Sequence, residues 1–103
     1  MLDMKAITLL WSKMMSDINE TLENRGSRYG TFIDNATMCQ MLKTVIRQSN
    51  AFPYMDPMHI EALDMITHKI SRILNGDPNY DDSWRDIAGY AMLVVKELEK
   101  NNG

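Results

Sequence analysis

Apolar residues recur along this chain at steps of three and four, which is the spacing of one face of an α-helix. No segment shows the sustained alternation with period two that a half-buried strand needs. The spacing predicts helices over about residues 3–24, 31–49, 57–75 and 81–100, joined by corners near 25–31, 50–56 and 76–81. Such short corners favour helices that lie beside their sequence neighbours. The sequence therefore predicts an all-α fold, a small antiparallel bundle of about four helices in a single domain over residues 1–103.

Residues with known preferences for helix ends place several of the boundaries. Asp3 is expected to cap the first helix and Gly26 to end it. The third helix is the best defined, because Asp56 is a typical N-cap residue, Pro57 suits the first helical position and Gly76 follows the last turn.

Each predicted helix carries an apolar stripe that is expected to face the core. The stripes comprise Ile7, Leu10, Trp11, Met14, Ile18 and Leu22 in the first helix; Ile33, Ala36, Leu42, Val45 and Ile46 in the second; Ile60, Leu63, Ile66, Ile70, Ile73 and Leu74 in the third; and Trp84, Ile87, Ala88, Ala91, Val94, Val95 and Leu98 in the fourth.

Composition narrows the classes of partner. A net charge of −3 provides no basic surface for double-stranded DNA, and no apolar run reaches the roughly 18 residues of a membrane span. Cys39 is the one cysteine, which excludes an intramolecular disulfide and is typical of a reduced, cytoplasmic compartment. A domain this small buries a limited share of its surface, so we expect a homo-oligomer. The ten methionines are a high count, and most are expected in the core, the other interpretation being an adaptable binding surface.

The stretch NGDPNYDDSWRDIAGY, residues 75–90, is the densest run of unusual residues. Its acidic part matches the first positions of a calcium-binding EF-hand loop at Asp77, Asn79 and Asp81. The match then fails, because Asp82 stands where that loop needs glycine and Ala88 stands where it needs a bidentate glutamate. The stretch is therefore interpreted as the corner between two helices.

Helical geometry brings charged residues together around that corner. Asp82 and Asp86 share one ridge of the fourth helix, and Lys69 and Arg72 lie near the end of the third. One interpretation is an ion pair from Arg72 to Asp82 or Asp86 that clamps the two helices. The other is a binding site, in which Lys69 and Arg72 hold a phosphate or an acidic partner and the two aspartates bind a metal or a polar group. The spacing leaves both open.

The segments ENRGSRYGTFIDNA and HKISRILNGDPNYDDSWRDIAGYAML resemble a family of small proteins of unknown function from tailed phages and prophages. The resemblance covers roughly residues 23–98 and implies that residues 1–17 are an N-terminal helical extension. It implies a phage or prophage origin, a helical fold and a place in the cytoplasm of the infected bacterial host. It brings no established activity. The residues that carry the pattern are Tyr29, Gly30 and Asn35; Lys69 and Arg72; and Asp82, Ser83, Trp84, Asp86, Ile87, Ala88, Gly89 and Tyr90.

Together these observations favour an accessory binding protein that needs no cofactor and acts on the host, in an anti-defence or host-takeover role. It would either sequester a nucleotide or cover a host protein. For a nucleotide, a tyrosine would stack on the base, the asparagine would read its edge, and the lysine and arginine would hold phosphate. For a host protein, a methionine-rich surface and the acidic residues would make the contact instead. The expected ligand-binding residues, called the motif residues below, are Tyr29, Gly30, Asn35, Lys69, Arg72, Asp82, Trp84, Asp86 and Tyr90.

Two alternatives stay open at this point. A magnesium-dependent nucleoside triphosphate pyrophosphohydrolase would hold Mg²⁺ with Glu61, Asp64, Asp82 and Asp86, although the dense Glu-x-x-Glu pair typical of such enzymes is missing. The second alternative is a virion or assembly component. Nucleophilic and zinc chemistry are disfavoured, because the cysteine and the two histidines form no recognised spacing. An enzyme is therefore not the leading expectation.

Overall fold

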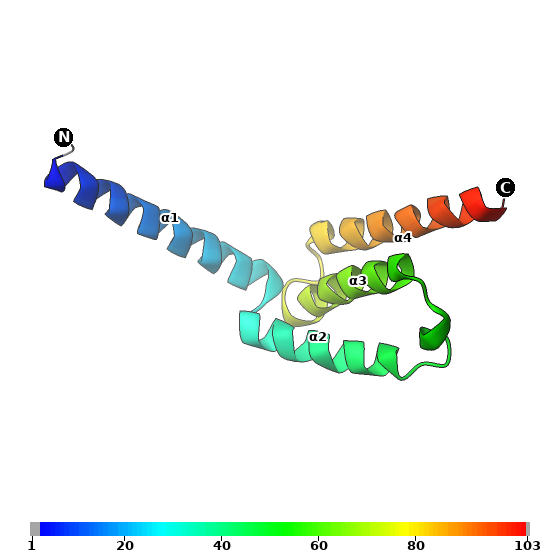
Figure 1. Cartoon of the computed structure of the whole chain (residues 1–103). Helices are drawn as coiled ribbons and strands as arrows, with labels where there is room; N and C mark the ends of the chain where they lie inside the picture. The colour runs from blue at the N-terminus through cyan, green and yellow to red at the C-terminus, as the bar shows by residue number, and fades with distance from the viewer. Residues whose placement is uncertain (1–2, 103) are drawn as a thin grey trace.

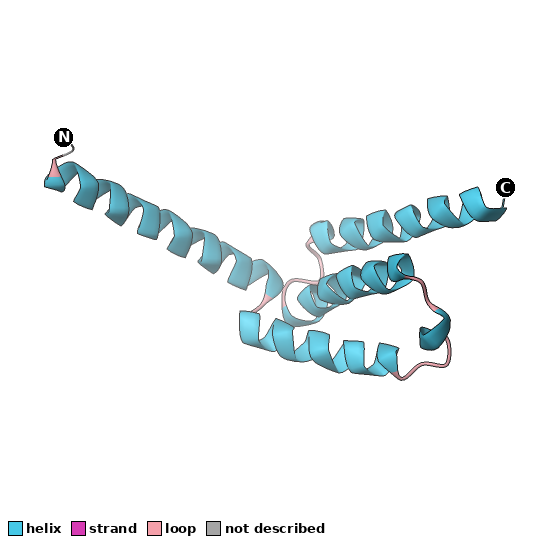
Figure 2. Cartoon of the chain, in the orientation of Figure 1, coloured by secondary structure: helices cyan, strands magenta, loops and turns pink. Residues whose placement is uncertain are grey.

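The computed structural model describes residues 3–102, apart from the side chain of Arg25, and these residues form helices and short connections with no strand (Figures 1 and 2). The predicted all-α class is confirmed. The elements are α1 (Met4–Tyr29), α2 (Phe32–Arg47), the short 3-10 helix η1 (Phe52–Tyr54), α3 (Pro57–Asn75) and α4 (Asp81–Asn102). None of the described helices is long and apolar enough to cross a membrane.

Helix α3 lies at the centre, packed against α2 on one side and α4 on the other, whereas α1 projects away from these three (Figure 1). The radius of gyration is 19.4 Å, against about 13 Å for a compact chain of this length. The molecule measures 62 × 30 × 26 Å along its principal axes, and its long dimension comes from the projecting helix α1. The bundle therefore consists of α2, α3 and α4, and α1 reaches it only through its C-terminal end.

The ends of the helices follow local chemistry, with one exception. The Asp3 carboxylate accepts the backbone N–H of Lys5 at 3.2 Å, and Asp56 and Pro57 begin α3 as predicted. The prediction that Gly26 ends the first helix is wrong, because α1 runs on to Tyr29. A glycine inside a helix costs only about 1 kcal/mol. Gly30 ends α1 instead, with φ 84°, a backbone conformation that side-chain-bearing residues rarely adopt.

The stripe predicted to bury α1 is exposed. Its side chains lie on the projecting helix, and Trp11, for example, keeps 63% of its surface accessible. The prediction that this stripe faces the core is wrong. Only the C-terminal end of α1 reaches the bundle, so the stripe lies away from α3. Among the described residues, those that are fully buried are small: Cys39, Thr67, Ser71 and Ser83.

The inward face of α4 also differs from the prediction. Ile87 and Val94 are half-buried as expected, but Trp84 is 53% exposed. Ala88, Ala91, Val95 and Leu98 are exposed as well. The helix is turned so that Asp82, Ser83, Asp86 and Tyr90 face the bundle. Smaller departures occur at Ile33 and Val45 of α2 and at Ile70 and Leu74 of α3, which are exposed members of otherwise half-buried stripes.

The two glycines near the end of α1 make a matched test. A Cβ at residue 30 would lie 2.5 Å from the carbonyl oxygen of Asn75, whereas a Cβ at residue 26 would meet nothing within 4 Å. We expect Gly30→Ala to lower the free energy of unfolding by about 2 kcal/mol or more in urea denaturation. Gly26→Ala should raise it by about 0.5–1 kcal/mol, because alanine favours the helix. Equal effects of the two substitutions would contradict the placement of the helix end.

Candidate functional site

The end of α1, the start of α2, the end of α3 and the start of α4 meet in one place, called the junction below and formed by residues 28–35, 69–77 and 80–86. Two glycines let the backbones touch there. A Cβ on Gly30 would collide with Asn75, and one on Gly76 would collide with the backbone of Arg28. The backbone N–H of Asp77 donates to the Arg28 carbonyl at 2.8 Å. The junction is therefore built on direct backbone contact between segments nearly 50 residues apart.

Asn35 ties α2 to the ends of both neighbouring helices. Its Nδ2 donates to the carbonyl oxygens of Tyr29, at 2.6 Å, and Thr31, at 2.9 Å. Its Oδ1 accepts the hydroxyl of Ser71 at 2.7 Å, and Nδ2 of Asn75 donates to the Ser71 carbonyl at 3.1 Å. The Asn35 amide is thus occupied on both sides, which leaves it little capacity to read a base edge.

Ser71 is a central residue that the sequence reasoning missed. It is fully buried, and Thr67 one turn earlier is buried beside it on the same face of α3. A pair of small polar residues four apart on an otherwise apolar helix face was the available signal, because buried hydroxyls in proteins have hydrogen-bond partners.

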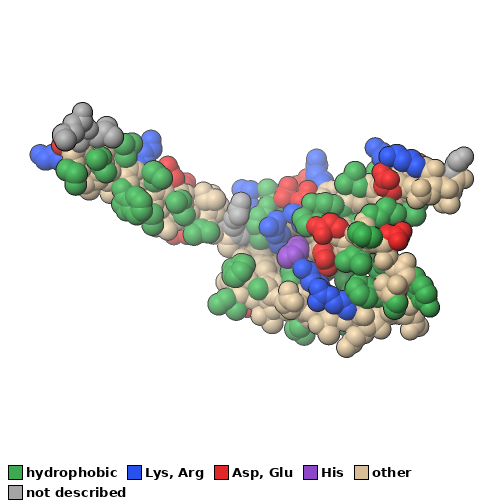
Figure 3. All heavy atoms as spheres, viewed as in Figure 1, with side chains coloured by type: hydrophobic (Ala, Val, Ile, Leu, Met, Phe, Trp, Pro, Cys, Tyr) green, Lys and Arg blue, Asp and Glu red, His purple; other side chains and the backbone are tan. Residues whose placement is uncertain are grey.

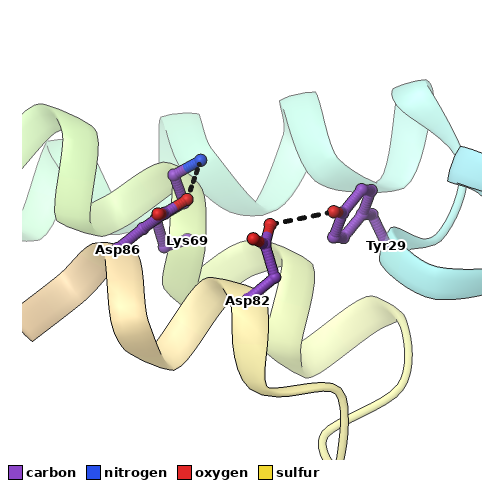
Figure 4. A network of polar contacts seen from close by, with 4 residues as sticks. All are labelled: Tyr29, Lys69, Asp82 and Asp86. Carbon is purple, nitrogen blue, oxygen red and sulfur yellow. Dashed lines mark hydrogen bonds and ion pairs between the residues drawn. The ribbon is translucent and has the colours of Figure 1, made fainter.

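Tyr29 links α1 to α4 (Figure 4). Its hydroxyl donates to Oδ2 of Asp82 at 3.0 Å. The guanidinium carbon of Arg72 lies 4.6 Å from the centroid of the Tyr29 ring, and the ring of Tyr80 lies 6.0 Å away. Burial, followed by the hydrogen bond to Asp82, raises the pKa of the Tyr29 hydroxyl above its ordinary value. The tyrosine stacks on a protein cation and is not presented to an outside base.

The ion pair between α3 and α4 has a different donor from the one expected. Nζ of Lys69 lies 2.9 Å from Oδ2 of Asp86, and the Lys69 side chain is 12% exposed (Figure 4). The expected bridge from Arg72 to Asp82 or Asp86 does not form. Arg72 stacks instead on the face of Tyr29, a contact that its flat guanidinium suits better than a lysine would.

The two remaining motif residues lie at the edges of the junction. The indole Nε1–H of Trp84 donates to the carbonyl oxygen of Pro78 at 2.9 Å and so anchors the loop before α4. Tyr90 is half-buried, one turn beyond Asp86 on the same side of α4. The structure thus brings together Tyr29, Gly30, Asn35, Lys69, Arg72, Asp82 and Asp86, with Trp84 and Tyr90 beside them.

Most polar side chains of the junction are engaged in contacts with one another. Within residues 3–102, every buried side-chain nitrogen or oxygen has a hydrogen-bond partner. The same residues contain no group of three or more His, Cys, Asp or Glu side chains placed to hold a metal ion, so Glu61 and Asp64 do not join Asp82 and Asp86 in a magnesium cluster. Shallow surface grooves lie along α1 and α2. The geometry of the junction suits tying helices together.

A family model described as "Domain of unknown function (DUF6378)" matches residues 13–98. The chain belongs to the DUF6378 family. No curated protein and no solved structure matches it. The matched range begins at residue 13, ahead of residue 23, where the resemblance in the motifs begins, and it contains all nine motif residues. In this DUF6378 chain the family region therefore includes the whole junction.

A second polar cluster joins α2 to α3 in this DUF6378 chain. Sγ of Cys39 lies 3.4 Å from Nδ1 of His68, and Nζ of Lys43 lies 3.2 Å from Nε2 of the same ring. Because an ammonium can only donate, Nε2 accepts and the proton is on Nδ1, directed at the thiol. Cys39 is only 2% exposed. A cysteine–histidine pair that the sequence spacing hid is therefore present, but Cys39 is buried, so a substrate cannot reach its thiol.

His68 gives the stability a dependence on pH. Partial burial lowers the pKa of the imidazole, and the charges of Lys43 and Arg72 lower it further, against a smaller opposing effect of Asp64. The unfolded chain therefore takes up a proton near pH 6.5 more readily than the folded chain does. We expect the free energy of unfolding to fall as the pH drops from about 7 to about 5.

The substitution His68→Gln keeps an acceptor for Lys43 and removes the titration, so it should flatten this profile in urea denaturation followed across that pH range. His59→Gln is the matched control and should leave the decrease in place. A wild-type profile no steeper than that of His68→Gln would show that the charge on His68 plays no such role.

Proposed function

We propose that this chain is a phage- or prophage-encoded accessory protein that binds a host protein in the cytoplasm of the infected bacterium, in a host-takeover or anti-defence role, and that its working form is a homo-oligomer. One observation carries the binding proposal: the motif residues are largely occupied with one another, while large apolar side chains lie on the outer faces of the helices (Figure 3). Monomeric proteins rarely expose large contiguous apolar patches, and such patches mark sites of protein contact. The phage context rests on the resemblance in the motifs.

The surface proposed for the host protein is the outer face of α4. Its apolar residues follow steps of four, three, four and three, which is the spacing of a stripe that packs against a partner helix. Three of them keep much of their surface accessible, at 53% for Trp84, 42% for Val95 and 39% for Leu98. The stripe consists of Trp84, Ala88, Ala91, Val95 and Leu98.

Nucleotide sequestration is the less favoured form of the binding proposal. A phosphate at the junction would have to draw Lys69 from Asp86 and Arg72 from the ring of Tyr29. The alternative hydrolase would need Asp82 and Asp86 for magnesium, and these carboxylates are engaged by Tyr29 and Lys69. Exposed helix faces also suit a virion or assembly component, for which enrichment of the protein in purified particles would be the evidence.

The host-binding surface can be tested with two substitutions on one helix. Val95→Glu places a charge on the stripe, and Leu93→Glu places the same charge at a 60% exposed position on another face of α4. In cross-linking and affinity capture from the host bacterium, we expect Val95→Glu to reduce recovery of a specific partner at least about tenfold, since a charge desolvated without a partner costs more than 1.4 kcal/mol. Leu93→Glu should capture the partner as the wild type does.

Native mass spectrometry with Mg²⁺ and a panel of nucleotides, cyclic dinucleotides included, separates the other readings. The proposal predicts neither a retained nucleotide nor a released pyrophosphate. Retention that Arg72→Ala abolishes would replace the host-protein proposal with sequestration. Pyrophosphate release that Asp82→Ala abolishes would replace it with hydrolysis.

A further inference from the structure

Helix α1 carries a long apolar stripe that stays exposed on the projecting part of the helix. At about 100° per residue, its large side chains fall on one side of the helix, opposite Lys5, Ser12, Ser16 and Glu20. Figure 3 shows hydrophobic side chains along the projecting helix. The α1 stripe, with the accessible fraction of each residue, consists of Ile7 (40%), Leu10 (57%), Trp11 (63%), Met14 (56%), Met15 (40%), Ile18 (49%) and Leu22 (59%).

The α1 stripe is nearly symmetric about its own midpoint. Ile7 and Leu22 lie equally far from a centre between residues 14 and 15, and so do Trp11 and Ile18. If a second copy of α1 runs antiparallel about that centre, Ile7 of one copy faces Leu22 of the other and Trp11 faces Ile18. A twofold interface requires such self-complementarity, because the same patch serves on both sides.

The charges on α1 favour the antiparallel direction. Residues 4–14 carry two lysines, Lys5 and Lys13, and no acid, whereas residues 15–24 carry Asp17, Glu20 and Glu23 and no base. None of these five side chains forms an ion pair within the part of the chain that the structure describes. A parallel pair would run the two acidic halves alongside each other, and an antiparallel pair runs the acidic half of one copy alongside the lysine-bearing half of the other, although Lys5 and Glu20 themselves lie on the side away from the stripe.

The helix dipole does not explain this distribution. It favours acids near the N-terminus of a helix and bases near the C-terminus, which fits Asp3 at the N-cap and Arg28 in the last turn but not Lys5 in the first turn or the acids at residues 17–23.

We propose that α1 of one chain packs antiparallel on α1 of a second copy through the α1 stripe, with the centre of the interface between Met14 and Met15. The two bundles then lie at opposite ends of the dimer, because α1 joins its bundle through its C-terminal end. The inference deepens the proposed homo-oligomer and is independent of the host-protein proposal, since the outer face of α4 is not used.

Sedimentation equilibrium of the full chain over a wide range of concentrations tests the interface. We expect a dimer for the wild type, and we expect Met14→Glu to weaken dimerisation at least about 100-fold, because the new charge would be buried near its own copy. Leu9→Glu is the matched control: Leu9 is 71% exposed on the opposite side of α1, so this variant should dimerise as the wild type does. Circular dichroism should give equal helicity for all three.

Disulfide trapping under mild oxidation tests the direction. In an antiparallel pair, the double variant Ile7→Cys with Leu22→Cys should form covalent dimers, and Ile7→Cys alone should not. A monomer at all concentrations, a dimer that persists in Met14→Glu, or efficient trapping of Ile7→Cys alone would each overturn the inference. So would a dimer that Val95→Glu dissociates, because α1 would then lie on α4 of the other copy. If Met14→Glu still captures the host partner, the proposed host binding stands whether or not α1 forms the dimer.

Discussion

At the junction the backbones of distant segments lie against each other, with Gly30 beside Asn75 and Gly76 beside Arg28. A side chain at either glycine would push these segments apart. The contact sets how far apart the ends of α1 and α3 can be, and it brings Asn35 within reach of Ser71. The hydrogen bonds and stacking around it then fix the directions in which the four helices leave. The rest of the structure depends on this close approach.

Two exposed apolar surfaces are consequences of the junction. Because α1 ends at Gly30 and enters only at its last turn, the α1 stripe stays outside the bundle. Because Asp82 accepts from Tyr29 and Asp86 pairs with Lys69, α4 is held with its acidic ridge inward and its apolar stripe outward. Ion pairs and hydrogen bonds thus occupy space where large apolar side chains would otherwise pack. The chain is left with a thin core and much apolar surface for partners.

Much of this was accessible from the sequence, for physical reasons that can be named. Helical spacing and the residues Asp3, Asp56 and Pro57 act locally, so they placed the helices and two of their starts. The motif residues pointed to a corner where charged and aromatic side chains converge. Gly26 was mistaken for the end of α1 because a glycine inside a helix costs little, whereas the need for glycine at residue 30 arises from a neighbour 45 residues away. The pairing of Cys39 with His68 was hidden by a similar separation.

The inward face of α4 shows what periodicity cannot decide. An apolar stripe marks a helix face that packs against other apolar side chains. It does not show whether these belong to the chain's own core or to a partner protein. Polar contacts settled the question here, and the choice between Lys69 and Arg72 as the partner of Asp86 depended on the ring of Tyr29, which comes from another helix. Predicting this choice requires the positions of α1, α3 and α4 relative to one another.

The motif residues act on one another across the junction. A double-mutant cycle between Tyr29 and Asp82 tests this most directly, using Tyr29→Phe, Asp82→Asn and the pair in urea denaturation at one protein concentration. Both substitutions preserve shape and alter the hydrogen bond between α1 and α4. If the two side chains act on each other across the junction, the coupling free energy is about 1–2 kcal/mol. A coupling within about 0.3 kcal/mol of zero would contradict this, because the two side chains would then contribute independently.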